Sequence, residues 1–120
     1  MKAKAVSKNL SKPEETRKFP KGKVDLVEVS GSLIGRGEFQ PGWKWSTSVK
    51  PIVKTKSCQA PHFQYQISGK MHVVMDDGTE FDTKAGDVMS IPPGHDAWVV
   101  GSEPVVVVDF QGFADYAKPK

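Results

Sequence analysis

The side chains best suited to chemistry in this chain of 120 residues gather in two short segments. In the first, His62, Gln64 and Gln66 alternate with apolar residues, a pattern typical of a β-strand that has one polar face. Cys58 precedes this strand, and His95 follows a Pro-Pro-Gly turn sequence in the second segment. Imidazole and thiol groups serve as acid–base catalysts and as metal ligands, so these residues are the first candidates for a functional site.

One arrangement of these side chains would hold a metal ion. Divalent transition metals need three or four converging ligands, and Cys58, His62 and His95 could supply three. Such a set suits zinc or copper better than iron. Because residues two apart on a strand share a face, we expect His95 to point to the same side as Ala97. The simpler alternatives are that Cys58 is a small buried hydrophobe and that His95 belongs to a polar turn.

A second arrangement needs no metal. Buried amides require hydrogen-bond partners, so a strand that turns Gln64 and Gln66 inward favours a cavity that holds water or a small polar ligand. Trp45 and Trp98 could wall this cavity with flat apolar area, although ordinary core packing explains a tryptophan equally well. If the strand has the opposite orientation, its apolar side chains face the interior instead.

His62 is the side chain that we expect to act as an acid or base if the chain is a catalyst, because imidazole titrates near neutral pH. Other catalytic patterns are missing from the sequence. It contains no phosphate-binding glycine loop, no GxSxG elbow and no HExxH pair.

The rest of the sequence has the pattern of short strands and turns that is typical of an all-β protein. Short runs rich in β-branched and aromatic residues recur at intervals of roughly ten residues, and Gly or Pro turns separate them. The pair Asp77-Gly78 between two such runs predicts a tight hairpin. We therefore divide the chain into a flexible basic arm over 1–22, a β-barrel domain over 23–113 and a C-terminal tail over 114–120.

The positive charge of the chain belongs to its N-terminal segment. Residues 1–23 carry a formal charge of +6 and the remaining residues −3. Nucleic-acid binding calls for a basic face interleaved with aromatic residues, and Phe19 is the single aromatic residue here, so we expect no nucleic-acid partner. No apolar run approaches the ~18 residues of a membrane span. A single cysteine suits a reducing compartment, and we expect a soluble, cytoplasmic protein.

The segment from Gly86 to Ala97, GDVMSIPPGHDA, is the most informative motif in the chain. It resembles the second signature of the cupin family, Gly-(x)5-Pro-x-Gly-(x)2-His, with Gly86, Pro92 and Gly94 in place. Ala97 stands where that signature has a histidine ligand. The resemblance implies a double-stranded β-helix, which is the jelly-roll barrel of the cupins, and it also implies a homodimer.

The first cupin signature, His-x-His followed by Glu and then Gly, can be aligned on Gly69. Lys56 and Cys58 then occupy the two histidine positions, and His62 occupies the glutamate position. The chain is similar to small bacterial single-domain cupins, but the resemblance implies that their usual metal ligands are replaced here.

We therefore predict an all-β cupin jelly-roll barrel with a flexible basic N-terminal arm, which binds a small polar or aromatic molecule inside the barrel without a metal. The predicted ligand contacts are Trp45, Cys58, His62, Gln64, Gln66, His95 and Trp98. The alternative is a cupin enzyme. It would be a metal-assisted oxygenase or isomerase that holds zinc, copper or iron at Cys58, His62 and His95, or a lyase or isomerase with His62 as its base.

Overall fold

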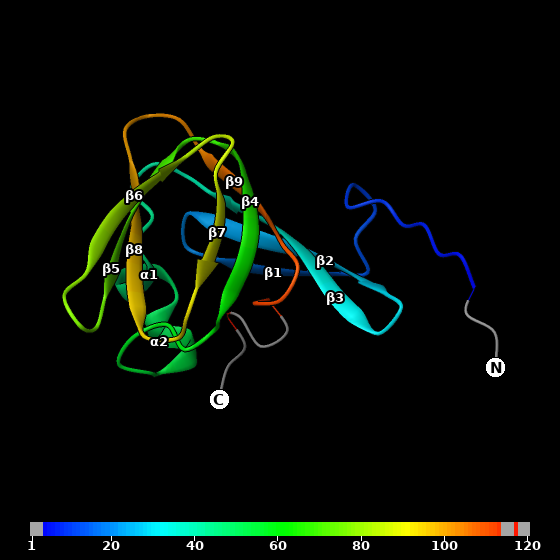
Figure 1. The fold of residues 1–120 in the computed structure, drawn as a ribbon, viewed down its shortest axis with the longest axis horizontal. Coiled ribbons are helices and arrows are strands. Elements are labelled where there is room, and N and C mark those ends of the chain that lie inside the picture. The colour runs from blue at the N-terminus through cyan, green and yellow to red at the C-terminus, as the bar shows by residue number, and fades with distance from the viewer. Residues whose placement is uncertain (1–3, 114–116, 118–120) are drawn as a thin grey trace.

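The structure is a computed structural model that describes residues 4–113 and residue 117. Within these residues the chain forms mostly strands, with two single-turn helices (Figure 1). No helix in this part of the chain is long and apolar enough to cross a membrane. The elements are β1 (Glu15–Phe19), β2 (Gly22–Val29), β3 (Ser32–Phe39), α1 (Trp45–Ser48), α2 (Lys50–Val53), β4 (His62–Ser68), β5 (Lys70–Met75), β6 (Glu80–Lys84), β7 (Val88–Ile91), β8 (His95–Val100) and β9 (Val105–Asp109).

Two antiparallel sheets enclose the core (Figure 1). The larger sheet has the strand order β1-β2-β3-β9-β4-β7, and the smaller has the order β6-β5-β8. The last strand, β9, lies between β3 and β4 and so joins the first half of the chain to the second. The return of a late strand into the middle of a sheet is typical of Greek-key jelly rolls. The predicted all-β barrel is confirmed.

Strand β4 has the orientation that its alternation predicts. The side chains of His62, Gln64 and Gln66 are buried, while the side chains at odd positions from Phe63 to Ile67 are about half exposed. The opposite orientation, with the apolar residues inward, is therefore excluded. The polar face of β4 thus lines the interior, and its apolar face is left on the outside of the larger sheet.

The N-terminal segment departs from the prediction. The flexible arm predicted over 1–22 is wrong for residues Glu15–Phe19, which form β1 and pair along their whole length with β2. Phe19 explains the difference, because its ring is buried and stacks on Phe39 with 6.0 Å between ring centroids. Pairing with a neighbouring strand here outweighs a polar, lysine-rich local sequence. The predicted tail over 114–120 lies outside the described residues except for residue 117.

Two glycines of the cupin-like signatures hold turns at positive φ. Gly69 connects β4 to β5 at a φ of 79°, and Gly86 precedes β7 at a φ of 95°. Their surroundings differ, because a Cβ built on Gly69 would lie 2.6 Å from Pro104 O, whereas one built on Gly86 meets nothing within 4 Å. The first glycine is required by both conformation and space, and the second by conformation alone.

We predict that Gly69→Ala destabilises the protein more than Gly86→Ala does. The left-handed backbone costs a side chain about 1 kcal/mol at either position. Gly69→Ala adds a clash with backbone, which raises its expected cost to about 3 kcal/mol. Urea unfolding of both variants and the parent measures the difference. Equal losses at the two positions would contradict the close packing against Pro104.

Candidate functional site

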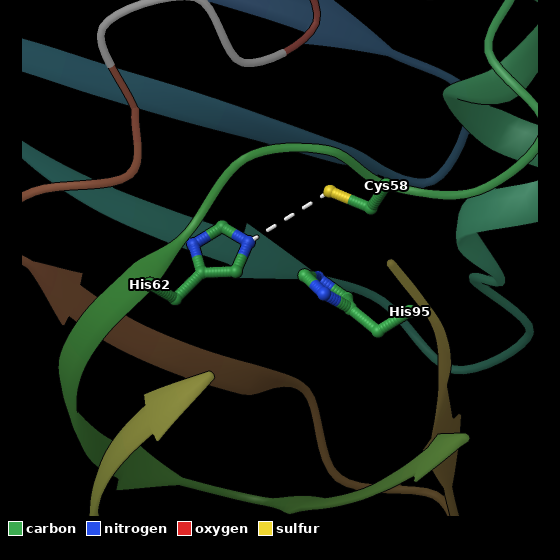
Figure 2. A group of neighbouring side chains, drawn as sticks. All are labelled: Cys58, His62 and His95. Atoms are coloured by element: carbon green, nitrogen blue, oxygen red, sulfur yellow. Dashed lines mark hydrogen bonds between the residues drawn. The ribbon is translucent and has the colours of Figure 1, made fainter. Parts of the chain in front are cut away.

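Cys58, His62 and His95 meet at one end of the barrel (Figure 2). One ligand atom from each residue lies within 4.8 Å of the others, and all three side chains are buried. A backbone bridge holds two of them together, since Cys58 N–H donates to His95 O at 2.7 Å and Gly94 N–H donates to Cys58 O at 2.7 Å. His62 approaches from the start of β4, where its Nε2 lies 3.9 Å from Cys58 Sγ.

Asp109 fixes the orientation of the His62 ring. Its Oδ2 lies 2.5 Å from His62 Nδ1, and its carboxyl group is fully buried at the end of β9. Its Oδ1 accepts backbone N–H groups from Gln111 at 2.8 Å and Gly112 at 2.6 Å. A hydrogen-bonded carboxylate at Nδ1 selects the tautomer in which that nitrogen carries the proton. The basic nitrogen of His62 is then Nε2, which faces the thiol.

His95 is held in a similar way by a backbone carbonyl. Its Nδ1 lies 3.0 Å from Pro92 O, so this nitrogen donates and Nε2 is the nitrogen available to a ligand. The neighbouring Asp96 takes no part, because its Oδ1 accepts the N–H groups of Ser46 and Ala97. Both histidines of the cluster are therefore anchored at Nδ1 by an acceptor.

Burial keeps the thiol of Cys58 and the imidazole of His95 uncharged near neutral pH. It raises the pKa of the Cys58 thiol to about 12, with smaller contributions from the negative charges of Asp109 and Asp96. Burial, followed by the charge of the nearby His62, lowers the pKa of His95 to about 4. Near neutral pH the site thus contains a thiol and a neutral His95 imidazole.

A cavity of about 30 Å³ adjoins the cluster. This volume holds an ion with one or two waters, whereas pockets for drug-sized molecules measure about 300–1,000 Å³. Apart from the cluster itself, the walls are mostly apolar. They are formed by Phe39, Trp43, Trp45, Gln64, Met71, Ala97 and Phe113. Trp43 Nε1 is a buried donor without an acceptor in the described part of the chain.

Five of the seven predicted contact residues lie at this cavity and two do not. Trp45, at the start of α1, and Gln64 line it together with the three cluster residues. Gln66 is fully buried, but its amide bonds Gly69 O at 2.9 Å and accepts the Thr83 hydroxyl at 2.6 Å, so it serves the turn after β4. Trp98 lies outside the barrel interior.

The ring of Trp98 packs on the outer face of the smaller sheet. His72 lies 4.8 Å from it, measured between ring centroids, and Lys44 Nζ lies 4.9 Å from its centroid. Alternation along β8 accounts for this placement, because His95 and Ala97 point inward and the next residue must point outward.

Sequence reasoning missed Asp109 and Met71. Asp109 ends the run Val-Val-Val-Val-Asp, and an acid that closes a fully apolar strand is a signal of a buried carboxylate. Met71 shares a strand face with Val73, which hid it among ordinary core residues. The sequence position of Asp109 does not reveal its proximity to His62, because β9 pairs with β4 from 47 positions away in the chain.

Comparison with known proteins identifies the architecture. No protein-family model and no curated protein matches the chain. A protein of unknown function from Rhizobium leguminosarum bv. viciae 3841 has a TM-score of 0.62 and 17% identity over 91% of this chain and 99% of that one. The oxalate decarboxylase of Lactobacillus farciminis has a TM-score of 0.58 and 20% identity over 88% of this chain and 31% of that one.

The fold is a cupin barrel. A variant of Bacillus subtilis oxalate decarboxylase agrees, with a TM-score of 0.57 and 25% identity over 82% of this chain and 28% of its own. The chain spans less than a third of the length of these two decarboxylases. Within the cupin barrel, Ala97 lines the cavity at the position of the usual histidine, and His95 enters from two residues earlier.

We predict that the metal-free protein loses stability as the pH falls from about 6.5 to about 4. The unfolded chain binds a proton at His95 in this window and the folded chain does not, so acid favours unfolding. The contribution is on the order of 3 kcal/mol at most. Urea unfolding across this pH range in the presence of a chelator measures it.

The matched variant for this experiment is His95→Asn, whose amide can still donate to Pro92 O but does not titrate. The difference in stability between parent and variant should shrink as the pH falls through the window. A difference that is independent of pH would contradict a depressed pKa at His95.

Proposed function

We propose that this chain is a metal-binding cupin in which Cys58, His62 and His95 hold a transition-metal ion. The observation that carries the proposal is the anchoring of both imidazoles at Nδ1, by Asp109 and by Pro92 O. Histidines that bind metals typically donate this second nitrogen to a carboxylate or a backbone carbonyl, which orients the ring and raises the basicity of the ligating nitrogen.

The spacing of the donors fits an ion with little movement. Ligand atoms about 2.0–2.3 Å from a metal lie roughly 3.4–4 Å from one another. Cys58 Sγ and His62 Nε2 are already 3.9 Å apart, and no pair in the cluster exceeds 4.8 Å. The ring of His95 therefore has less than about 1.5 Å to travel toward the other two donors.

Metal binding also agrees with the protonation states that the cluster residues would need as ligands. A cation favours the thiolate and neutral imidazoles, so it reverses the effect of burial on Cys58 and agrees with the neutral state of His95. The sequence favours a metal-free site for a small polar or aromatic ligand, and an aromatic ligand finds too little room in a cavity of about 30 Å³.

The chain's own residues would shape what reaches the ion. A bound metal supplies Lewis-acid polarisation of a small ligand at an open position. Aromatic side chains form much of the wall around that position, and Trp43 Nε1, which has no acceptor among the described residues, offers a donor there. We infer that the ligand is a small molecule with an oxygen acceptor. Because the donor set differs from the usual cupin ligands, the activity of the oxalate decarboxylases is not transferred to this chain.

We predict that protein produced without a histidine tag binds one equivalent of a divalent transition metal. Elemental analysis after dialysis against limiting metal measures the stoichiometry. His62→Ala and His95→Ala should each lower the affinity by at least about 100-fold, since each removes a ligand from a three-ligand site. His72→Ala is the control, because His72 lies on the outer face of the smaller sheet. Equal affinity in all four proteins would refute the proposal.

We also propose that the chain pairs with a second copy through the outer face of the larger sheet. Phe63, Tyr65 and Ile67 of β4 are about half exposed there. Val88 is 68% exposed and lies opposite Tyr65 in the strand register, and Phe110 donates its N–H to Phe63 O at 2.9 Å. The five side chains therefore form one continuous apolar face.

The extent of this apolar face favours a dimer. Half of the area of three aromatic side chains gives roughly 300 Å², and the two aliphatic side chains add about half as much again. The largest apolar patch on a typical monomer is about 300–600 Å² and is often functional, and a standard interface needs about 800 Å² from each partner. A flat sheet face can pack on its own copy about a two-fold axis, with this patch as the apolar centre of the interface.

We predict that Tyr65→Lys combined with Val88→Lys converts the protein from dimer to monomer, because four lysines would meet across the two-fold axis. Light scattering coupled to gel filtration gives the mass. Val100→Lys is the control, since Val100 is 42% exposed but lies on β8 in the other sheet. A monomeric parent protein at micromolar concentration would overturn the proposal.

A further inference from the structure

The ligand atoms of Cys58, His62 and His95 limit which metal ion the site would prefer. This inference rests on the metal site proposed above. Soft thiolate ligands select copper, zinc and iron–sulfur clusters, whereas imidazole suits zinc, copper, iron and nickel. Two imidazoles and one thiolate therefore point to zinc or copper. Asp109 bonds His62 at Nδ1, the nitrogen away from Cys58, and accepts backbone N–H groups, so it adds no hard oxygen ligand.

The walls of the cavity favour copper over a structural zinc site, because few of them could supply a fourth protein ligand. Zinc in proteins takes four ligands, the fourth being a protein group in structural sites and water in catalytic ones. Around Cys58, His62 and His95, most lining side chains are apolar and offer no strong fourth ligand. The exceptions are the thioether of Met71 and the amide of Gln64. The Nε2 of Gln64 already donates to the sulfur of another methionine, Met89, at 3.5 Å.

Three strong ligands with a weak thioether or amide nearby are the pattern of copper. Trigonal sites of two histidines and one cysteine, with a long axial bond to Met or Gln, are the sites of blue copper proteins. We propose that Cys58, His62 and His95 form a copper site of this type, with two imidazole nitrogens and one thiolate sulfur as its strong ligands, inside a cupin barrel.

The surroundings of the thiol suit this metal. Copper(II) can oxidise thiols to disulfides, and that reaction needs two sulfurs in contact. Cys58 is the single cysteine of the chain, and its side chain is 3% exposed. Neither an internal partner nor a second copy can reach the sulfur without unfolding of the loop before β4. The thiolate can therefore stay bound to the metal.

The test uses the full chain, without a histidine tag and stripped of metal by a chelator. Copper(II) is titrated into it under argon, and zinc(II) is titrated into a second sample. We expect one equivalent of copper to produce an intense visible thiolate-to-copper charge-transfer band. Cys58→Ser should abolish this band, and His72→Ala should keep it at full intensity. X-ray absorption at the copper edge should count one sulfur and two nitrogens, whichever oxidation state is present.

The outcomes separate this inference from the proposed function. If zinc or copper binds stoichiometrically through His62 and His95, but copper shows only nitrogen and oxygen ligands and Cys58→Ser changes nothing, the copper–thiolate site is refuted and the metal-binding function stands. If neither ion binds with defined stoichiometry, both fail. If circular dichroism shows that the Cys58→Ser variant is unfolded, the Cys58→Ala variant replaces it, because a buried methyl group leaves no polar atom unpaired. The Cys58→Ala variant must also lose the band.

Discussion

The hydrogen bond between His62 and Asp109 is the contact on which the candidate site depends. It joins the first residue of β4 to the last residue of β9 and is fully enclosed by protein. Its geometry exists only because β9 returns to lie between β3 and β4, 47 positions along the chain from His62. The same carboxyl group accepts the N–H groups of Gln111 and Gly112, so the turn after β9, the ring of His62 and the strand order are fixed together.

The sequence predicts the fold well because its turns and alternation are local signals. Gly69 and Gly86 lie at positive φ in the turns that the cupin-like signatures require, and β4 shows its polar side chains inward as its alternation indicates. Residues 15–19 were missed for the opposite reason. Their mostly charged composition carries no strand signal, and the burial of Phe19 against Phe39 appears only when both segments are folded.

The three residues that lie together in the cluster were candidates from the sequence, but the contacts that hold them in place were not predicted. Chemistry and strand parity identify Cys58, His62 and His95, because a residue type and its face can be read from neighbours in sequence. The buried acid that orients His62 cannot be read in this way, since no local pattern tells which strand will lie beside β4. Trp98 illustrates the alternation of side chains along β8. It follows Ala97 in sequence, yet its ring lies against His72 on the outside of the barrel.

The positions of His95 and Ala97 together explain where the third donor of the proposed site comes from. Both point inward from β8, and the usual histidine position carries only a methyl group, so the histidine of this chain lies one inward-facing position earlier along the strand. The backbone bridge from Cys58 to His95 exists at that earlier position. A histidine at position 97 would lie farther from this bridge. This placement brings an imidazole next to the thiol, so the proposed ligand set contains sulfur where the cupin-like signatures have an acid and a further histidine.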